Sequence, residues 1–162
     1  MRTIKSIVGV AVIIFAFSAA AECRQKKEKP APAKAQSTTV EYQSASNPQA
    51  RTLSDFVRVG DILYLSGKLG TDSAGNLAPG GIGPETKQTM ENIKAVLEKN
   101  GSSMDNVIKC TVMLADIKEW ADMNTVYTTF FKKERLPARS ALGVSGLVRN
   151  ARVEIECMAT LK

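Results

Sequence analysis

Histidine is missing from this 162-residue sequence, and only three cysteines are present. Without histidine, the chain cannot assemble a Ser-His-Asp or Cys-His arrangement for nucleophilic catalysis. The cysteines show no C-x-x-C spacing, and no histidine can complete a set of zinc ligands around them. The sequence therefore predicts neither histidine-based catalysis nor a metal site.

A clustered basic surface is missing too. The formal net charge is +6, but residues 1–50 hold seven lysines and arginines against three glutamates, so residues 51–162 are nearly neutral. A nucleic-acid footprint needs basic residues gathered on one face of the fold. We therefore expect no nucleic-acid partner. The KKEK run near the N-terminus is interpreted as a solvated stretch or a weak contact with anionic lipid.

The third missing feature is a long membrane span. The apolar run SIVGVAVIIFAFSAAA, residues 6–21, is shorter than the about 20 residues that a transmembrane helix needs. It follows the basic start MRTIK and ends in three alanines, as secretory signal peptides do. We therefore predict a signal peptide over residues 1–21 and export to the periplasm or another extracytoplasmic space. The alternative is a single anchoring helix.

Residues 22–50 are rich in Lys, Pro, Ala, Gln and Ser and offer little to bury. This composition predicts a disordered arm. Cys23 leaves lipidation open, because lipoproteins are cut just before a cysteine that then carries the lipid. The preceding residue is normally small, however, and here it is Glu22. A plain N-terminus and a membrane tether through Cys23 are the two alternatives.

The remaining residues, 51–162, alternate between strand and helix patterns. Strands are predicted at 56–59, 61–67, 106–116, 139–144 and 151–161, and helices at 84–100 and 117–134. The order β-β-α-β-α-β-β indicates an α+β domain whose two helices cover one face of the sheet. The other face carries mixed polar and apolar residues, so it is either solvated or an oligomer interface.

Cys110 and Cys157 fall inside two of these predicted strands, on faces that they share with valine and isoleucine. A thiol in such a place usually behaves as a small buried hydrophobe. An oxidising compartment permits a bridge between the two, but geometry decides whether it forms. We expect two free buried thiols, with a disulfide as the alternative.

Four segments together resemble the Rid family, the reactive intermediate deaminases of YjgF type. They are SGK after a predicted strand, ADMNTVYTTFF on the second predicted helix, and LPARSALGV and RVEIECMA toward the C-terminus. The resemblance covers residues 53–161. It implies a chorismate-mutase-like fold with a mixed sheet, assembled as a homotrimer with clefts at the subunit boundaries. It also implies hydrolysis of reactive enamines and imines to 2-keto acids and ammonia, without a cofactor.

A 2-imino acid has a carboxylate to be held and an imine carbon that water must reach. Arg139 can hold a planar carboxylate with two parallel hydrogen bonds and keeps its charge. A hairpin turn near residues 146–150 would set Glu154 nearly opposite Arg139. Glu154 could then deprotonate the water and return a proton to the leaving ammonia. The alternatives are an arginine that caps a surface loop and a glutamate that forms an ion pair.

The resemblance extends to further substrate-binding positions. Ser66 in LSGK and Asn124 in DMNTVY match a pocket serine and a helix asparagine of the family, and backbone groups around Ala141 and Gly143 are expected to add donors. Turn chemistry is the alternative for Ser66, and a helix-surface position is the alternative for Asn124.

The sequence also departs from the family pattern. Leu53 stands in place of a tyrosine, Ala141 in place of a cysteine, Val148 in place of a proline, and Lys68 in place of a glutamine. Loss of the tyrosine hydroxyl leaves a larger apolar wall, which favours either a bulkier imino acid or binding without fast turnover. The second function class is therefore a non-catalytic trimeric binding module for small carboxylates or a protein partner.

Overall fold

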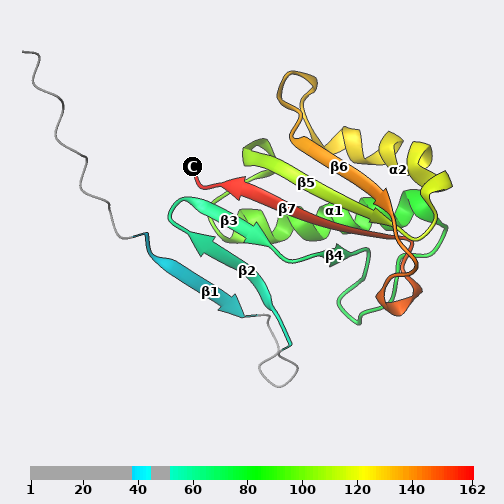
Figure 1. Cartoon of the computed structure of the whole chain (residues 1–162), viewed down its shortest axis with the longest axis horizontal. Coiled ribbons are helices and arrows are strands. Elements are labelled where there is room, and N and C mark those ends of the chain that lie inside the picture. Colours follow the sequence, from blue (N-terminus) through cyan, green and yellow to red (C-terminus); the bar gives the residue numbers. More distant parts are fainter. Residues whose placement is uncertain (1–37, 45–51) are drawn as a thin grey trace, which may run out of the picture. The chain divides into compact units, whose positions relative to one another are not determined.

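The computed structural model describes residues 38–44 and 52–162 (Figure 1). Its helices are α1 (Ile82–Lys99) and α2 (Trp120–Tyr127), with short 3-10 turns between the main elements. Its strands are β1 (Val40–Ser44), β2 (Ser54–Val59), β3 (Ile62–Leu65), β4 (Lys68–Leu69), β5 (Val107–Leu114), β6 (Ala138–Gly143) and β7 (Val153–Thr160). The predicted α+β class is confirmed, and β1 and the short β4 are additions to it.

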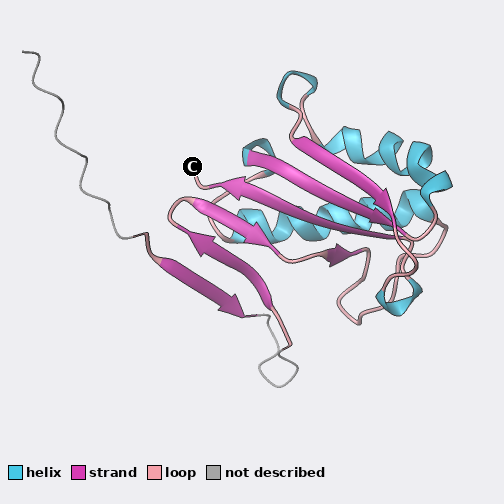
Figure 2. Cartoon of the chain, in the orientation of Figure 1, coloured by secondary structure: helices cyan, strands magenta, loops and turns pink. Residues whose placement is uncertain are grey.

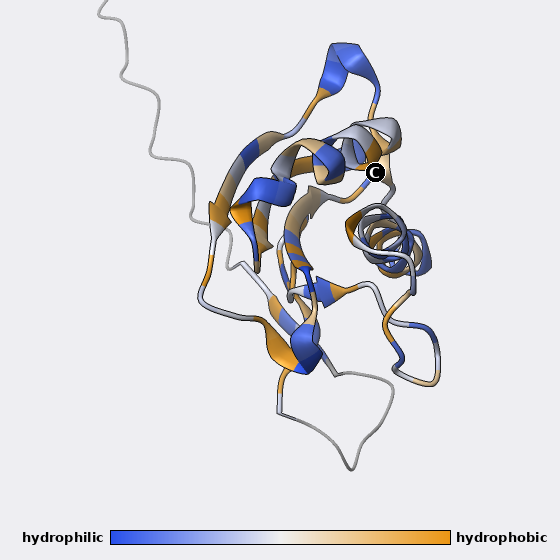
Figure 3. Ribbon diagram, turned by 90° about the vertical axis from the view of Figure 1, so that its right-hand side faces the viewer, coloured by the Kyte–Doolittle hydropathy of each residue, from blue (hydrophilic) through white to orange (hydrophobic). Residues whose placement is uncertain are grey.

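The strands form one mixed sheet in the order β1-β2-β3-β7-β5-β6, and β4 pairs with β7 beyond the end of β3. Strands β5 and β6 run parallel, whereas the other neighbouring pairs are antiparallel. Both helices cover the same face of the sheet, as predicted, and leave the other face open (Figure 2). Hydrophilic and hydrophobic residues alternate along the strands, as expected for a sheet with unlike faces (Figure 3).

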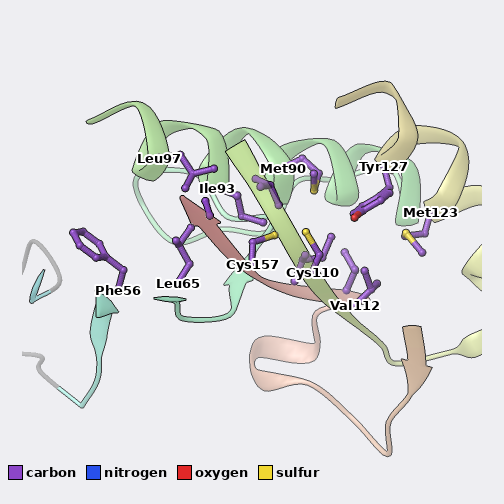
Figure 4. Close-up of a cluster of buried hydrophobic side chains, with 14 of the residues drawn as sticks. Phe56, Leu65, Met90, Ile93, Leu97, Cys110, Val112, Met123, Tyr127 and Cys157 are labelled. Carbon is purple, nitrogen blue, oxygen red and sulfur yellow. The ribbon is translucent and has the colours of Figure 1, made fainter. Parts of the chain in front are cut away.

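The core lies between this sheet face and the helices (Figure 4). Helix α1 contributes Met90, Ile93 and Leu97, which are fully buried and recur at helical spacing. The helix begins after Gly80 and Gly81, whose φ angles of 106° and 91° suit glycine in the tight turn before it. The strands contribute alternate buried residues, among them Cys110, Val112, Val153, Ile155 and Cys157.

The predicted disordered arm over residues 22–50 is wrong at its C-terminal end. Val40–Ser44 form β1, which pairs antiparallel with β2 at the edge of the sheet. Composition missed this strand because it is short and exposed, with Tyr42 73% accessible to solvent. Residues 22–37 and 45–50 of the predicted arm, with Cys23 among them, and the predicted signal peptide over 1–21 lie outside the described residues. Within residues 38–44 and 52–162, no helix is both long enough and apolar enough to cross a membrane.

The predicted hairpin between the last two strands is also wrong. Strand β6 pairs with one side of β5 and β7 with the other, so β5 separates them. The connecting residues 144–152 pass the end of β5, where Val144 N donates to Leu114 O at 2.9 Å and Ala115 N donates to Arg152 O at 2.9 Å. A connector of this length can reach past a neighbouring strand, whereas a tight turn cannot.

Candidate functional site

Arg139 lies under helix α2 on the helix-covered face of the sheet. Strand β6 sets it beside Cys110 of β5, whose side chain is buried against the helices. The guanidinium carbon is 4.6 Å from the centre of the Tyr127 ring and 5.6 Å from that of Trp120. Two ring faces at these distances attract the cation and hold the guanidinium in one orientation.

Arg139 and Asn124 each keep a polar atom free for a ligand. Arg139 Nη1 and Asn124 Oδ1 are buried, and neither has a hydrogen-bond partner among the described residues. Asn124 lies one helical turn before Tyr127, on the same side of α2. Leaving a buried donor or acceptor unpaired is costly, so such atoms point to a ligand that pairs them. The donor suits a carboxylate, and the amide oxygen suits an N–H or O–H group.

The backbone of β6 borders the same site. Ala141 is half-buried two residues beyond Arg139 and so points to the same face. A Cβ atom on Gly143 would lie only 3.1 Å from that of Ile117, so the backbone passes close to the segment that leads into α2. Among the described strands, β6 has a neighbour on one side only, and an edge strand offers unpaired N–H groups. We call Asn124, Arg139 and the backbone at Ala141 and Gly143 the helix-side half-site.

Glu154 lies on the opposite face of the sheet. Its neighbours Val153 and Ile155 in β7 are fully buried toward the helices, so Glu154 points to the open face. A Cβ atom on Gly67 would overlap the Glu154 carboxylate, which therefore lies directly over that glycine. Ser66 precedes Gly67, and its Oγ donates to Ser54 O at 2.6 Å. We call Ser66, Gly67 and Glu154 the open-face half-site.

Two departures from the family pattern lie beside the open-face half-site. Leu53 immediately precedes the residue that accepts the Ser66 hydrogen bond, and it is 57% exposed. Lys68 follows Gly67, and its Nζ forms an ion pair with Asp55 Oδ1 at 2.7 Å. The lysine charge is therefore neutralised locally, while Leu53 presents an apolar surface to solvent.

The predicted contact between Arg139 and Glu154 is wrong within one chain. In the strand register Arg139 aligns with Cys110 and Cys157, whereas Glu154 aligns with Met113. The two side chains leave opposite faces of the sheet, so no rotamer brings them together. The structure thus groups Ser66 with Glu154 and places Asn124 on the side of Arg139, but it separates the two groups.

The aromatic residues that hold Arg139 were missed as site residues. The helical pattern places Trp120 and Tyr127 in an apolar stripe, and Tyr127 is indeed buried. A polar hydroxyl within an apolar stripe was the available signal, because a buried tyrosine usually sits next to a polar partner. Burial raises the pKa of the Tyr127 hydroxyl above its ordinary value, so this group stays protonated.

Metal ligands do not gather in the described ranges. Within residues 38–44 and 52–162, no group of three His, Cys, Asp or Glu side chains could hold a metal ion. The helix-side half-site instead combines one cation and backbone donors, which suit a small carboxylate, with one amide oxygen, which suits an N–H or O–H group on the same ligand.

Comparison with known proteins identifies the family. The model of the Endoribonuclease L-PSP family matches residues 44–161. A protein of Mus musculus named 2-iminobutanoate/2-iminopropanoate deaminase is 43% identical over 107 residues, covering 65% of this chain and 78% of that protein. A RutC family protein of Pyrococcus abyssi is 38% identical over 107 residues, covering 65% of this chain and 84% of that protein.

Solved structures give the same result. Yeast Mmf1 superposes with a TM-score of 0.70 at 32% identity, over 76% of this chain and 100% of that one. RidA from an Antarctic Psychrobacter bacterium superposes with a TM-score of 0.66 at 33% identity, over 78% of this chain and 99% of that one. The chain therefore belongs to the Endoribonuclease L-PSP family, which is the Rid or YjgF-type family that its motifs indicated.

Proposed function

We propose that this protein hydrolyses 2-imino acids and their enamine tautomers to 2-keto acids and ammonia. The observation that carries the proposal is the buried Nη1 of Arg139, whose guanidinium lies against two aromatic rings of α2 and which has no hydrogen-bond partner among the described residues. The same helix carries the buried Asn124 amide oxygen, which also lacks a partner among those residues. A relative at 43% identity bears the name of such a deaminase. The substrate class would be small 2-imino carboxylates, and the reaction needs only water as its second reactant.

A homotrimer is part of the proposal, because one chain does not complete the site. Arg139 and Glu154 leave opposite faces of one sheet, so a reaction that uses both requires two copies. The open face has features of an interface: Tyr64 and Leu142 are 40% and 42% exposed. A hollow of about 220 Å³ lies on the same face, lined in part by Tyr64, Lys109 and Met158. We propose that the open-face half-site of one subunit meets the helix-side half-site of its neighbour.

The chemistry follows from the two half-sites. Arg139 would bind the substrate carboxylate, with backbone N–H groups at Ala141 and Gly143 as further donors. The Asn124 amide oxygen would accept a hydrogen bond from the imine nitrogen and orient it. The imine carbon would then face the Glu154 carboxylate of the neighbouring subunit.

Glu154 would act as general base and then as general acid. It would take a proton from water while the water oxygen bonds to the imine carbon, and it would pass this proton to the nitrogen to give a tetrahedral amino alcohol. Glu154 would then remove the hydroxyl proton and deliver it to the nitrogen as the C–N bond breaks, so that the carbonyl forms and ammonia leaves. Because the Ser66 hydroxyl already donates to Ser54 O, its lone pairs remain free to accept a hydrogen bond from the attacking water.

The substrate side chain is proposed to be larger than that of the smallest imino acids. Leu53 presents an apolar surface beside the open-face half-site, and Trp120 is 40% exposed beside Arg139. Ala141 leaves room where a larger residue would fill the strand surface. Apolar walls on both half-sites favour an apolar side chain by burying it from water.

A second candidate is a binding module without turnover, favoured by Leu53 alone, since it offers no polar group to the site. The two candidates separate in one assay of ammonia and keto-acid release from freshly generated imino acids. Wild type should accelerate release, and Arg139→Ala should lower kcat/KM by about 10- to 100-fold, the value of a charged hydrogen bond. Arg135→Ala, on the exposed turn before β6, is the matched control and should retain activity. Equal rates with and without wild-type protein would favour the binding module.

Export of the protein is proposed from the sequence of residues 1–21. An exported deaminase needs a source of imino acids outside the cytoplasm, such as amino-acid oxidation at the membrane. N-terminal sequencing of the protein recovered from fractionated cells tests this point. A mature N-terminus near residue 22 in the extracytoplasmic fraction is expected, and an intact Met1 in the cytoplasmic fraction would contradict export.

A further inference from the structure

Cys110 and Cys157 face each other across two neighbouring strands. Cys110 in β5 and Cys157 in β7 are paired in the antiparallel register, and both are buried as free thiols. Both side chains leave the sheet on the helix-covered face, with the sulfur atoms turned toward one another (Figure 4). No step of the proposed deaminase reaction uses either thiol.

The hydrogen-bond ladder shows which kind of cross-strand pair they form. Ala115 N donates to Arg152 O at 2.9 Å, which places residues 115 and 152 at a hydrogen-bonded position of the ladder, although Arg152 N itself donates to Glu85. Hydrogen-bonded and non-hydrogen-bonded pairs alternate along an antiparallel ladder, and the register is continuous from Lys109 to Leu114. Counting back five pairs makes Cys110 and Cys157 a non-hydrogen-bonded pair.

Non-hydrogen-bonded pairs have the closer side chains. Their Cα atoms lie about 4.5 Å apart, and disulfides bridge Cα separations of about 4.4–6.8 Å. The strands therefore already hold the two residues at a separation that a disulfide spans. Because both thiols leave the same face, no strand needs to turn for the sulfurs to bond.

The surroundings make the two thiols chemically unequal. A hydrogen bond from Cys157 is the largest cause that lowers the pKa of Cys110, and Tyr127 and the positive charge of Arg139 act in the same direction. The same hydrogen bond is the largest cause that raises the pKa of Cys157, and burial is the second largest. Cys110 is accordingly the better thiolate of the pair and the one suited to attack an oxidant first.

We propose that Cys110 and Cys157 form an intramolecular disulfide when the chain folds in the presence of a small disulfide oxidant such as oxidised glutathione. The Cys110 thiolate attacks one glutathione sulfur and expels the first glutathione thiolate. Cys157 then loses its proton, attacks the Cys110 sulfur and expels the second glutathione thiolate. The two cysteines are oxidised by two electrons, and one oxidised glutathione becomes two reduced glutathiones after protonation.

The bridge forms while β5 and β7 pair and before the helices cover them, because both sulfurs are shielded from solvent in the folded chain. The loop that it closes runs from residue 110 to residue 157 and contains α2 and β6, which carry Asn124 and Arg139. Closing this loop restricts the unfolded chain and so stabilises the helix-side half-site against unfolding. This inference rests on strand geometry alone and does not depend on the proposed enzyme activity.

Peptide mapping tests the proposal on the full chain. The unfolded protein is refolded with oxidised or with reduced glutathione, alkylated after unfolding, and digested with trypsin without reduction. The expected product of oxidised folding is the peptide 110–118 joined to the peptide 153–162, together with a higher melting temperature than the reduced form. Cys157→Ala is the matched control, and its melting temperature should not depend on the glutathione used.

Several results would overturn the proposal. If Cys110 and Cys157 are both found alkylated after refolding with oxidised glutathione, no bridge has formed and the proposal is wrong. A stable mixed disulfide with glutathione, or a bridge from either cysteine to Cys23, would also contradict it. Failure to fold in oxidised glutathione, when the reduced sample folds, would show that the bridge and the fold are incompatible. A parallel sample of Cys23→Ser should give the same linked peptide as the wild type.

Discussion

At the scale of single residues, the Arg139 guanidinium is oriented by aromatic side chains that have no chemical role in the proposed imine hydrolysis. Its guanidinium rests against Tyr127 and Trp120, which fix its direction, while Nη1 remains unpaired among the described residues. The Tyr127 ring therefore matters more than its hydroxyl, which points into the core near Cys110 (Figure 4). We regard Tyr127 as a positioning residue.

Two substitutions separate the ring of Tyr127 from its hydroxyl. Tyr127→Phe keeps the ring against Arg139 and removes only a buried hydroxyl, so activity should stay near wild type and stability should change by less than about 1 kcal/mol. Tyr127→Leu removes the cation–π contact and should raise KM about 5- to 10-fold, with a smaller effect on kcat. Imine hydrolysis and urea unfolding of both variants provide the readouts. Equal KM values for the two variants would contradict the role of the ring.

Gly67 offers a test of the open-face half-site. In Gly67→Ala the new Cβ would overlap the Glu154 carboxylate, which must move because it is the flexible end of a side chain. Displacing a general base should lower kcat by about 10-fold or more. The matched control is Gly83→Ala, whose Cβ would make an ordinary contact with Val126 at 3.8 Å. Unchanged kcat in Gly67→Ala would show that Glu154 does not act from its present place.

At the scale of elements, patterns within a segment and the tight β2–β3 turn were predicted well, whereas the predicted pairing of β6 with β7 was wrong. The β2–β3 hairpin, α1 and β7 follow from local periodicity, and each is confirmed. Alternation along β5 buries Cys110, Val112 and Leu114, whereas Ile108, which simple alternation would place on the same face, is 43% exposed because the β5–β7 register shifts between Val107 and Lys109. A single-residue shift of this kind leaves no mark in composition.

The strand order explains why the candidate site residues could be chosen from the sequence, whereas the contact between Arg139 and Glu154 could not be predicted correctly. Asn124 and Ser66 came from motifs, and Glu154 came from its place in the last predicted strand. The predicted contact with Arg139 failed because β6 pairs in parallel with β5, and nothing in residues 144–152 distinguishes a hairpin from a crossing connector. Long-range strand pairing is fixed by the whole sheet and not by the sequence of the connector.

Glu85 links two of these elements and provides a stability test. This carboxylate is buried in the first turn of α1, and its Oε1 accepts from Arg152 N at 2.7 Å and from Val153 N at 3.3 Å. Glu85→Ala leaves both backbone donors unpaired and should lower the free energy of unfolding by about 2–4 kcal/mol. Glu85→Gln keeps an acceptor and should lose less. Urea unfolding checks both, and equal losses would show that the hydrogen bonds are not the cause.

At the scale of the whole molecule, the sheet leaves one face uncovered and divides the proposed catalytic groups, Arg139 and Glu154, between its faces. Burial of the open face between copies would cover exposed Tyr64 and Leu142 and would also bring the two half-sites together. Assembly and activity are therefore one claim in this account. A monomer in solution, measured by sedimentation at working concentration, would leave Arg139 and Glu154 apart.

The most direct measurement of this central claim uses two inactive variants in one assembly. Arg139→Ala and Glu154→Gln are each expected to lose most activity, and the two are then co-refolded in equal amounts. If each site draws its arginine and glutamate from different subunits, about a quarter of the interfaces regain both wild-type residues, and activity returns to about a quarter of wild type. Native mass measurement confirms that mixed assemblies have formed. Mixed assemblies without restored activity would contradict a site shared between subunits.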